Sequence, residues 1–284
     1  MQLSQALHEA LSPRLTRLEA QLLMLHTLGR PPCDRAWLLG HDDALLDASA
    51  LSRFQACCRR RAEGEPVAYI TGTKAFFGLD LVVDRRVLDP RADTETLVEW
   101  GLQAILGLQG PHILDLGTGS GAVALALAHT RPDAQVCAVD ASTDALAVAQ
   151  ANARRLGVPV EFLQGNWFDT TPPLPHAYHL VVSNPPYIPM ADPHLAALTH
   201  EPHAALASGT DGLDDLRHII AQAPPYLRPS GWLLLEHGYN QAEAVRNLLA
   251  QRGFTAVQSR DDIAGISRCS GGRYAGLLAE PSQQ

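Results

Sequence analysis

The sequence predicts an α/β protein whose main part is a seven-stranded, doubly wound sheet, preceded by a small helical bundle and a β-hairpin. From residue 113 onward, short apolar runs alternate with stretches of helical periodicity, as in sheets covered by helices on both faces. Turns rich in glycine or proline follow two of these runs, at the strand ends where such sheets bind ligands. The expected strands cover 113–116, 136–139, 159–163, 179–183, 231–236, 255–258 and 273–278, and the expected helices cover 122–129, 144–156, 214–226 and 241–252.

Composition limits the classes of protein to consider. The chain has 284 residues, 46% of them hydrophobic, which suits a main domain and a smaller second one. Its five cysteines are odd in number and lack metal-type spacing, which argues against a disulfide framework. No apolar run is long enough to span a membrane and no signal-type segment opens the chain, so we expect a cytoplasmic protein without membrane contact. A net charge of −8 disfavours direct binding of nucleic acid.

The pattern of residues 1–66 predicts three helices. Leucines recur at helical spacing between residues 15 and 25. Asp34 is placed to cap a short second helix, and a third helix begins near Asp47. No catalytic arrangement is visible in this segment, so we expect a domain that docks the substrate.

Residues 67–88 are expected to be extended and to form a β-hairpin linker. Two short runs of apolar and β-branched residues flank Gly78 there, which is the pattern of a hairpin. The main domain is then expected to cover 89–284, with Asp93 or Thr94 capping its first helix.

A glycine-rich loop follows the first strand of the main domain. The segment Asp115-Leu-Gly-Thr-Gly-Ser-Gly121 has glycines at alternate positions, which permits a tight turn and close approach of the backbone to a ligand. A dinucleotide-binding fingerprint needs its third glycine one residue later. The next strand ends at Asp140, where a carboxylate is placed to accept hydrogen bonds from ribose hydroxyls. Together they indicate a nucleoside-binding site.

The fourth strand ends in Asn184-Pro-Pro-Tyr187. Neither proline can donate to a sheet ladder, so the strand must stop at Asn184. The result is a rigid loop at the carboxyl end of a strand, with an amide side chain, bare carbonyl groups and an aromatic ring.

These elements resemble the S-adenosylmethionine-dependent methyltransferases that modify amide or exocyclic amino nitrogens. Further segments resemble the bacterial protein-(glutamine-N5) methyltransferases of class-I peptide chain release factors, the PrmC/HemK family. These segments are 90–95, 165–168, 201–202 and 233–238. The resemblance covers essentially the whole chain. The chain differs from the family pattern at Asp89, Ala92, Asn166 and His200.

The resemblance implies a Rossmann-like methyltransferase sheet, S-adenosyl-L-methionine as methyl donor and S-adenosyl-L-homocysteine as product. It also implies class-I release factors as protein substrates, methylated in translation termination on the glutamine of their Gly-Gly-Gln motif. We expect a monomer.

We assign the chemistry to the loop after the fourth strand. An amide nitrogen is a poor nucleophile, and two acceptors on its N–H bonds favour the charge that develops during methyl transfer. We expect these acceptors to be the Asn184 side-chain oxygen and the Pro185 carbonyl, with Tyr187 packing on the amide. The expected cofactor-binding residues are Asp115, Gly117, Thr118, Gly119, Ser120, Gly121, Asp140, Trp167 and Asn184. The expected substrate-binding residues are Asn184, Pro185, Pro186, Tyr187, Arg91 and Glu201.

Other functions remain as alternatives. One alternative is N6-adenine methylation of nucleic acid, because the exocyclic amine of adenine must be held against the methyl donor in the same way as an amide nitrogen. The net charge of the chain disfavours it. N5-glutamine methylation of a ribosomal protein is another, disfavoured by the Asp-Thr-Glu after Arg91. A non-enzymatic adenosine-binding module and a nicotinamide dehydrogenase are weaker alternatives. No metal site is expected, because no cysteine or paired acid accompanies the histidines at 194, 200 and 203.

Overall fold

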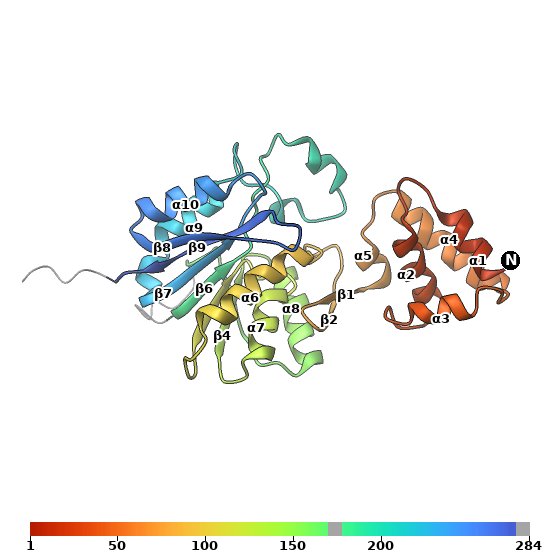
Figure 1. Cartoon of the computed structure of the whole chain (residues 1–284), viewed down its shortest axis with the longest axis horizontal. Helices are drawn as coiled ribbons and strands as arrows, with labels where there is room; N and C mark the ends of the chain where they lie inside the picture. Colours follow the sequence, from red (N-terminus) through yellow and green to blue (C-terminus); the bar gives the residue numbers. More distant parts are fainter. Residues whose placement is uncertain (170–177, 277–284) are drawn as a thin grey trace, which may run out of the picture. The chain divides into compact units, whose positions relative to one another are not determined.

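The computed structural model describes residues 1–169 and 178–276. The chain divides into two compact units (Figure 1). A helical unit consists of Met1–Thr73 with Ala196–His200, and a sheet unit consists of Lys74–Leu195 with Glu201–Gln284. The domain boundaries expected at residues 66 and 88 stay a prediction. No helix within the described part of the chain is long and apolar enough to cross a membrane.

The helical unit is held together by a single apolar cluster. Its helices are α1 (Leu3–Ala10), α2 (Arg17–Thr27), α3 (Arg35–Gly40), α4 (Ala48–Ala62) and α5 (Val67–Thr71). Leu23 and Leu25 of α2 and Phe54 of α4 are almost completely buried in this cluster. At the start of α2, Thr16 and Glu19 exchange hydrogen bonds in a capping box, which satisfies free N–H groups of the first turn.

Three details of the helical unit differ from the sequence-based expectation. α1 was not expected, because its eight residues carry only a short apolar face. Residues 67–71 were expected to be extended but form α5, which buries Ile70 in the helical core and ends at Gly72 in the left-handed conformation. The Asp34 side chain does not cap α3 and forms an ion pair with Arg30.

The expected hairpin is present. Its strands β1 (Thr73–Phe76) and β2 (Leu79–Val82) are joined by Phe77 and Gly78, both with positive φ. That combination is typical of a two-residue hairpin turn whose twist matches the strands. Asn152, fully buried in α8 (Thr143–Leu156), exchanges two hydrogen bonds with the backbone of Val82 and donates a third to the Ser120 carbonyl. One side chain therefore fastens the hairpin to the glycine loop.

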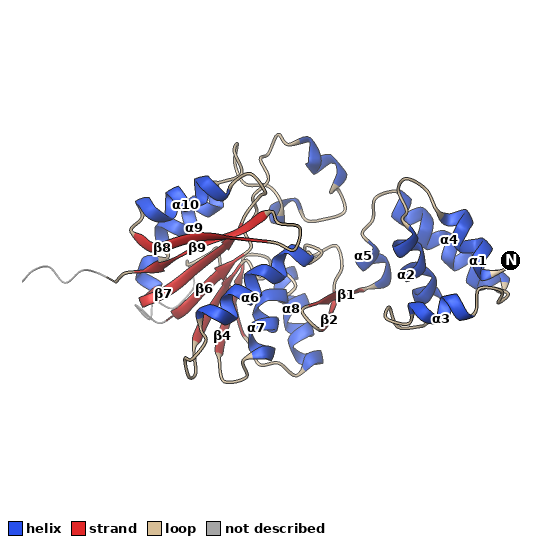
Figure 2. Cartoon of the chain, viewed as in Figure 1, coloured by secondary structure: helices blue, strands red, loops and turns tan. Residues whose placement is uncertain are grey.

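The main sheet has seven strands, as predicted, in the order β5-β4-β3-β6-β7-β9-β8. Figure 2 draws its strands in red, with helices packed around them. The strands are β3 (His112–Leu116), β4 (Gln135–Asp140), β5 (Glu161–Gln164), β6 (Tyr178–Ser183), β7 (Leu227–Glu236), β8 (Phe254–Asp261) and β9 (Ser267–Tyr274). All pairs from β5 to β7 are parallel, and β9 runs antiparallel to both neighbours. The order of strands reverses between β3 and β6, which is the position where open α/β sheets bind ligands.

The last strand was predicted at the wrong place. It was expected over 273–278, whereas β9 covers Ser267–Tyr274, and residues 277–278 lie outside the described part of the chain. β9 is rich in serine and glycine and lacks the β-branched residues that signal a strand. Its glycines are required by packing, since a Cβ atom on Gly271 would lie 2.6 Å from the Leu233 carbonyl oxygen.

Helices cover both faces of the sheet, and alternate residues of β6 contact them. Val181 belongs to the apolar cluster that includes Ile219 of α9 (Asp214–Gln222) and Val245 of α10 (Ala242–Gln251). Leu180 and Val182 face the other side, next to Gly101 of α6 (Glu95–Ala104), which also adjoins α7 (Ala122–Thr130). This alternation follows from the two-residue period of a strand. The helix expected over 214–226 ends at Gln222, because prolines follow at 224 and 225.

Candidate active site

A cavity of about 370 Å³ opens at the carboxyl ends of the central strands. The loops after β3, β4, β5 and β6 line it, together with residues from 86–94, 202–205 and Asp215 of α9. Its size lies in the range of small-molecule sites. Of the residues predicted to bind a cofactor, all but Gly121 line this cavity.

The glycine loop adopts the conformation that its sequence predicts. Gly117, Gly119 and Gly121 all have positive φ. Gly121 is also crowded, because a Cβ atom there would lie 3.0 Å from Leu125 and 3.2 Å from Ala149. Side chains at these positions would strain the backbone, and at Gly121 one would also displace α7 or α8, so the loop keeps this conformation only with glycine.

Asp115 stabilises the loop from inside. Its side chain is buried, and Oδ2 accepts hydrogen bonds from the Thr118 hydroxyl at 2.6 Å and from the Ala124 backbone N–H at 3.2 Å. Burial raises the pKa of this carboxyl to about 7, although the two donors favour the charged form. Asp115 thus connects the end of β3 with the first turn of α7 at the edge of the cavity.

Asp140 connects two backbone segments around the cavity. Oδ2 accepts from the Gly119 N–H at 2.8 Å, and Oδ1 accepts from the Ser142 N–H at 2.9 Å. Burial raises the pKa of Asp140, and the same two donors oppose that shift. Each carboxylate oxygen has further lone pairs, so the group can still accept hydrogen bonds from a ligand in the cavity.

Trp167 forms part of the cavity wall beside the glycine loop. Its backbone has a positive φ of 54°, uncommon for a bulky residue, and its ring lies 3.1 Å from the position that a Cβ atom of Gly117 would occupy. The indole therefore rests against the glycine that the sequence places at the start of the loop.

The loop after β6 brings polar groups to the same cavity. Asn184 and Pro186 line the cavity, whereas Pro185 is buried and does not line it. The Asn184 side-chain nitrogen donates to the Thr94 hydroxyl oxygen at 3.2 Å. The Tyr187 hydroxyl donates to Glu236 at 3.3 Å, and its partly buried ring packs against the sheet's apolar cluster. Burial raises the pKa of Tyr187, so its hydroxyl keeps its proton.

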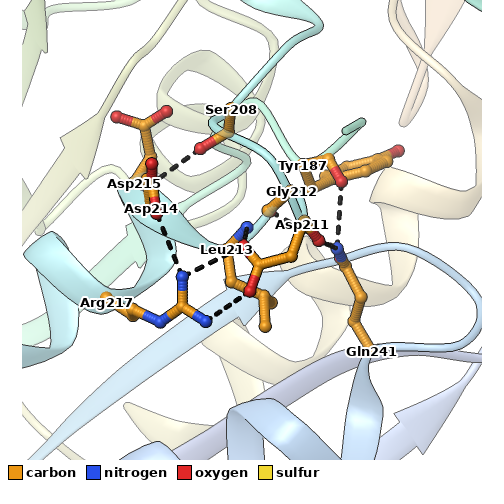
Figure 3. Close-up of polar contacts among 9 residues, drawn as sticks. All are labelled: Tyr187, Ser208, Asp211, Gly212, Leu213, Asp214, Asp215, Arg217 and Gln241. Atoms are coloured by element: carbon orange, nitrogen blue, oxygen red, sulfur yellow. Dashed lines mark hydrogen bonds and ion pairs between the residues drawn. The ribbon is translucent and has the colours of Figure 1, made fainter. Parts of the chain in front are cut away.

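Gln241, which sequence reasoning did not identify, holds the backbone of this loop (Figure 3). Its side-chain nitrogen donates to the Tyr187 carbonyl at 3.0 Å and to the Gly212 carbonyl at 3.3 Å, and its oxygen accepts from the Gly238 N–H at 2.8 Å. Gly212 must be glycine, because a Cβ atom there would lie 2.2 Å from the Tyr187 carbonyl oxygen. The segment that contains Gly212 is fixed further, because the Asp215 backbone N–H donates a hydrogen bond to the Ser208 hydroxyl.

Arg91 and Glu201, both predicted to bind substrate, contact each other. Arg91 Nη2 lies 2.5 Å from Glu201 Oε1, and Arg91 Nη1 lies 3.3 Å from Asp89 Oδ2. Lys74 pairs with the other Asp89 oxygen at 3.0 Å, and the Asp89 N–H donates to Glu201. Burial lowers the pKa of Arg91, but the two acids outweigh it and raise the pKa overall. Asp89, which departs from the family pattern, is therefore balanced by two cations.

Histidine, cysteine and acidic side chains do not gather into a metal-binding group of three or more anywhere in residues 1–169 and 178–276. The Thr94, Glu236 and Gln241 contacts were missed by sequence reasoning. The segments 90–95 and 233–238 were noted for their resemblance, but only the folded chain shows that they adjoin the Asn-Pro-Pro-Tyr loop.

Comparison with known protein families matches both parts of the chain. The PrmC N-terminal domain matches residues 1–72, and the methyltransferase small domain matches residues 94–209. A release factor glutamine methyltransferase from Xylella fastidiosa (strain Temecula1) is 48% identical over 275 residues, which cover 96% of this chain and 98% of that protein. One from Burkholderia pseudomallei is 48% identical, covering 92% and 93% of the two chains.

Solved structures support the fold of the sheet unit. A methyltransferase from Pyrococcus furiosus superposes with a TM-score of 0.54 at 19% identity and covers 80% of this chain and all of that one. The 16S rRNA N2 G1207 methyltransferase of Thermus thermophilus, solved with AdoMet and guanosine, gives a TM-score of 0.52 at 19% identity over 71% of this chain and 49% of that one.

Proposed function

Since the chain belongs to the family of release factor glutamine methyltransferases, we propose that it methylates the N5 amide nitrogen of the glutamine in the Gly-Gly-Gln motif of class-I release factors. The methyl donor in this proposal is S-adenosyl-L-methionine, and the product is S-adenosyl-L-homocysteine. One observation carries the proposal: the glycine loop, Asp140 and Asn184 all line a single cavity. In this proposal the site that binds the nucleoside therefore lies next to the group that holds the substrate amide.

The residues present fit this methyl donor. Asp140 has lone pairs left for ribose hydroxyls, and the Trp167 ring stands at the wall where a flat base can pack. Asp115 and Asp140 make this edge of the cavity acidic, which suits a cationic ligand. When bound there, the donor supplies an electrophilic methyl group on a positively charged sulfur. The glycine loop and both acids hold and orient it.

Asn184 and Pro185 hold the glutamine amide in this proposal. The Asn184 side-chain nitrogen is engaged by Thr94, so its oxygen remains as the acceptor for one N–H of the substrate amide. The backbone carbonyl of Pro185, next to Asn184 in the same loop, supplies the second acceptor in this proposal. Two acceptors on one nitrogen favour the positive charge that develops there, which is electrostatic stabilisation by preorganised groups.

No strong base is required, because the nitrogen loses its proton readily after methyl transfer. Tyr187 does not itself line the cavity, and its hydroxyl donates to Glu236; in this proposal it covers the substrate amide from the loop and limits access of water. The small glycines of the Gly-Gly-Gln motif let the glutamine reach a site that a bulkier backbone could not enter.

The helical unit docks the release factor away from the reacting glutamine in this proposal. It has its own apolar core and contributes no residue that lines the cofactor cavity. In the sheet unit, the Arg91–Glu201 pair fixes the segment that begins at Pro202 and lines the cavity, and so shapes the substrate side. Because release factors act in translation, we place the protein in the cytoplasm, acting as a monomer.

Mass spectrometry tests the function directly. A purified class-I release factor is incubated with the full chain and methyl-labelled S-adenosyl-L-methionine, then digested and mapped. We expect one added methyl on the Gly-Gly-Gln glutamine. With Asn184→Ala, one amide N–H loses its partner, and turnover should fall about 10²–10³-fold, as for loss of one preorganised oxyanion-hole donor. A methyl on a ribosomal protein or on adenine, with none on the release factor, would overturn the proposal.

A further inference from the structure

His237 follows the last residue of β7 and is completely buried. Both nitrogens of its ring are paired: Nδ1 lies 2.9 Å from the Gly238 carbonyl oxygen, and Nε2 lies 2.8 Å from the Ser270 hydroxyl oxygen. A polar ring can be buried without a large penalty only when it is paired in this way. His237 is not among the residues that line the cavity, so contact with a ligand does not account for it.

A relay of hydroxyl groups connects the Nε2 side of this ring to α10. The Ser270 hydroxyl, on β9 and fully buried, lies 2.7 Å from the Ser259 hydroxyl on β8. Ser259 in turn accepts a hydrogen bond from Arg246 Nη1 at 2.7 Å. Arg246 belongs to the middle of α10. The relay therefore joins the end of β7, through β9 and β8, to that helix.

The groups at the two ends of the relay set its direction. A guanidinium only donates and a carbonyl only accepts, so His237 Nδ1 must carry a proton for the Gly238 carbonyl. Burial lowers the pKa of the ring, its bond to the carbonyl opposes that shift, and the charges of Arg246 and Arg268 lower the pKa further. The ring is therefore neutral at pH 7. Nε2 is then a bare acceptor, so the Ser270 hydroxyl donates to it.

The Gly238 carbonyl leads to Gln241, the residue that holds the Asn-Pro-Pro-Tyr loop. It also accepts from the Gln241 backbone N–H at 3.0 Å, which closes a four-residue turn. Within that turn the Gly238 N–H donates to Gln241 Oε1, which directs Nε2 toward the Tyr187 carbonyl. His237 therefore holds the turn from the sheet, and the turn sets the direction of the Gln241 amide.

We propose that His237 is a positioning residue for methyl transfer. As the neutral Nδ1–H tautomer it holds the turn at Gly238, and the turn holds Gln241 in place. Gln241 in turn keeps the Asn-Pro-Pro-Tyr loop in the position from which Asn184 holds the substrate amide. The inference rests on the proposed function, because it needs this loop to hold the glutamine. It assigns a role to the histidine of the segment 233–238, which the reaction itself leaves unused.

Two amide variants of His237 in the full chain test which of its bonds matters. His237→Asn places an amide nitrogen where Nδ1 stands, because both atoms are bonded to Cγ, so it can still donate to the Gly238 carbonyl. His237→Gln places its amide near Nε2 and keeps only the contact with Ser270. We expect kcat on the release factor to stay within about threefold of wild type for asparagine. For glutamine it should fall about tenfold, the ratio that corresponds to one lost net hydrogen bond.

The order of the two variants separates positioning from packing. Packing alone would favour glutamine, because it fills more of the space that the ring leaves. Equal kcat values, or a lower kcat for His237→Asn, would therefore overturn the positioning role. His129→Asn, at an exposed position near the end of α7, is the matched control and should keep the wild-type kcat. The calorimetric Kd for S-adenosyl-L-methionine should change less than about threefold in each variant, because neither His237 nor Gln241 lines the cavity.

NMR of the wild type tests the tautomer without any variant, and so applies even if the variants unfold. The ring of His237 is assigned through its own backbone resonances in uniformly isotope-labelled protein. At pH 7 we expect a proton on Nδ1 and a bare Nε2. An imidazolium, or a ring with its proton on Nε2, would overturn the positioning role alone, with methylation by the wild type intact. Absence of methyl on the glutamine with the wild type would overturn the proposed function and this inference with it.

Discussion

Gln241→Glu gives a sharp test of how the Asn-Pro-Pro-Tyr loop is held. The change replaces the Nε2 donor by an oxygen of almost the same size. That oxygen then lies about where Nε2 stood, 3.0 Å from the Tyr187 carbonyl oxygen and 3.3 Å from the Gly212 carbonyl oxygen. When ionised it repels these two carbonyls and that of Asp211, which is 3.4 Å away, and leaves all three without this donor. When protonated it can donate to Tyr187, and the original bond is largely restored.

The magnitude follows from these contacts. Loss of a buried hydrogen bond with an acceptor left unpaired costs about 1–3 kcal/mol, and the variant loses the two N–H donors that three carbonyls share, so we expect a loss of roughly 2–4 kcal/mol in the free energy of unfolding at pH 8. Because the carbonyls disfavour the charged form, the pKa of the introduced carboxyl is raised in the folded state. The deficit should therefore be smallest below about pH 4, the unfolded pKa, where only one of the two donors is missing, and grow by about 1.4 kcal/mol per pH unit above it, levelling off once pH exceeds the folded pKa.

Urea unfolding of wild type and variant between pH 4.5 and 8.5 measures this difference, with methyl transfer at pH 8 as a second readout. Turnover should fall together with stability, because Tyr187 belongs to the loop that holds the substrate. Glu243→Gln serves as a surface control. The reasoning fails if the deficit does not depend on pH, or if Gln241→Glu is as stable as the wild type at pH 8.

Three further predictions concern the cofactor wall and the helical unit. Asp140→Ala removes a charged acceptor whose hydrogen bonds to the ligand contribute roughly 1.5–3 kcal/mol, so calorimetric titration should show S-adenosyl-L-methionine binding at least tenfold more weakly. Unchanged affinity would refute the assignment, and tight binding of NAD by the wild type would favour a dehydrogenase. Asp115 has its pKa raised by burial to about 7, so ionisation costs stability as pH rises from about 4 to 7; Asp115→Asn, which can keep both hydrogen bonds to Oδ2, should flatten that loss in urea titrations at pH 5 and 8. Deleting residues 1–66 should leave cofactor binding nearly intact and lower turnover on the whole release factor, and wild-type turnover by the truncated chain would exclude a docking role.

The sequence alone determined the features that depend on neighbouring residues. Alternation of apolar runs with helical periodicity predicted the seven-stranded sheet, and the glycine spacing and the prolines at 185 and 186 predicted loops at strand ends. These signals are local, because a strand, a helix cap or a tight turn is decided by a few consecutive residues. The same dependence on neighbouring residues explains why two elements were predicted wrongly. β9 and α5 lack strong local signals, and packing against Leu233 and the helical core decided their conformations.

Only the tertiary structure decided which side chains support the site. Thr94, Glu236 and Gln241 lie 90, 49 and 54 positions from their partners in the loop after β6. They meet that loop because β7 pairs with β6, and because the segment before α6 reaches the same edge of the sheet. A hydrogen bond depends on distance and direction in space, and strand order sets both. The sequence shows that Glu236 is an acid, but only the fold shows that it is buried and accepts a hydrogen bond from the Tyr187 hydroxyl.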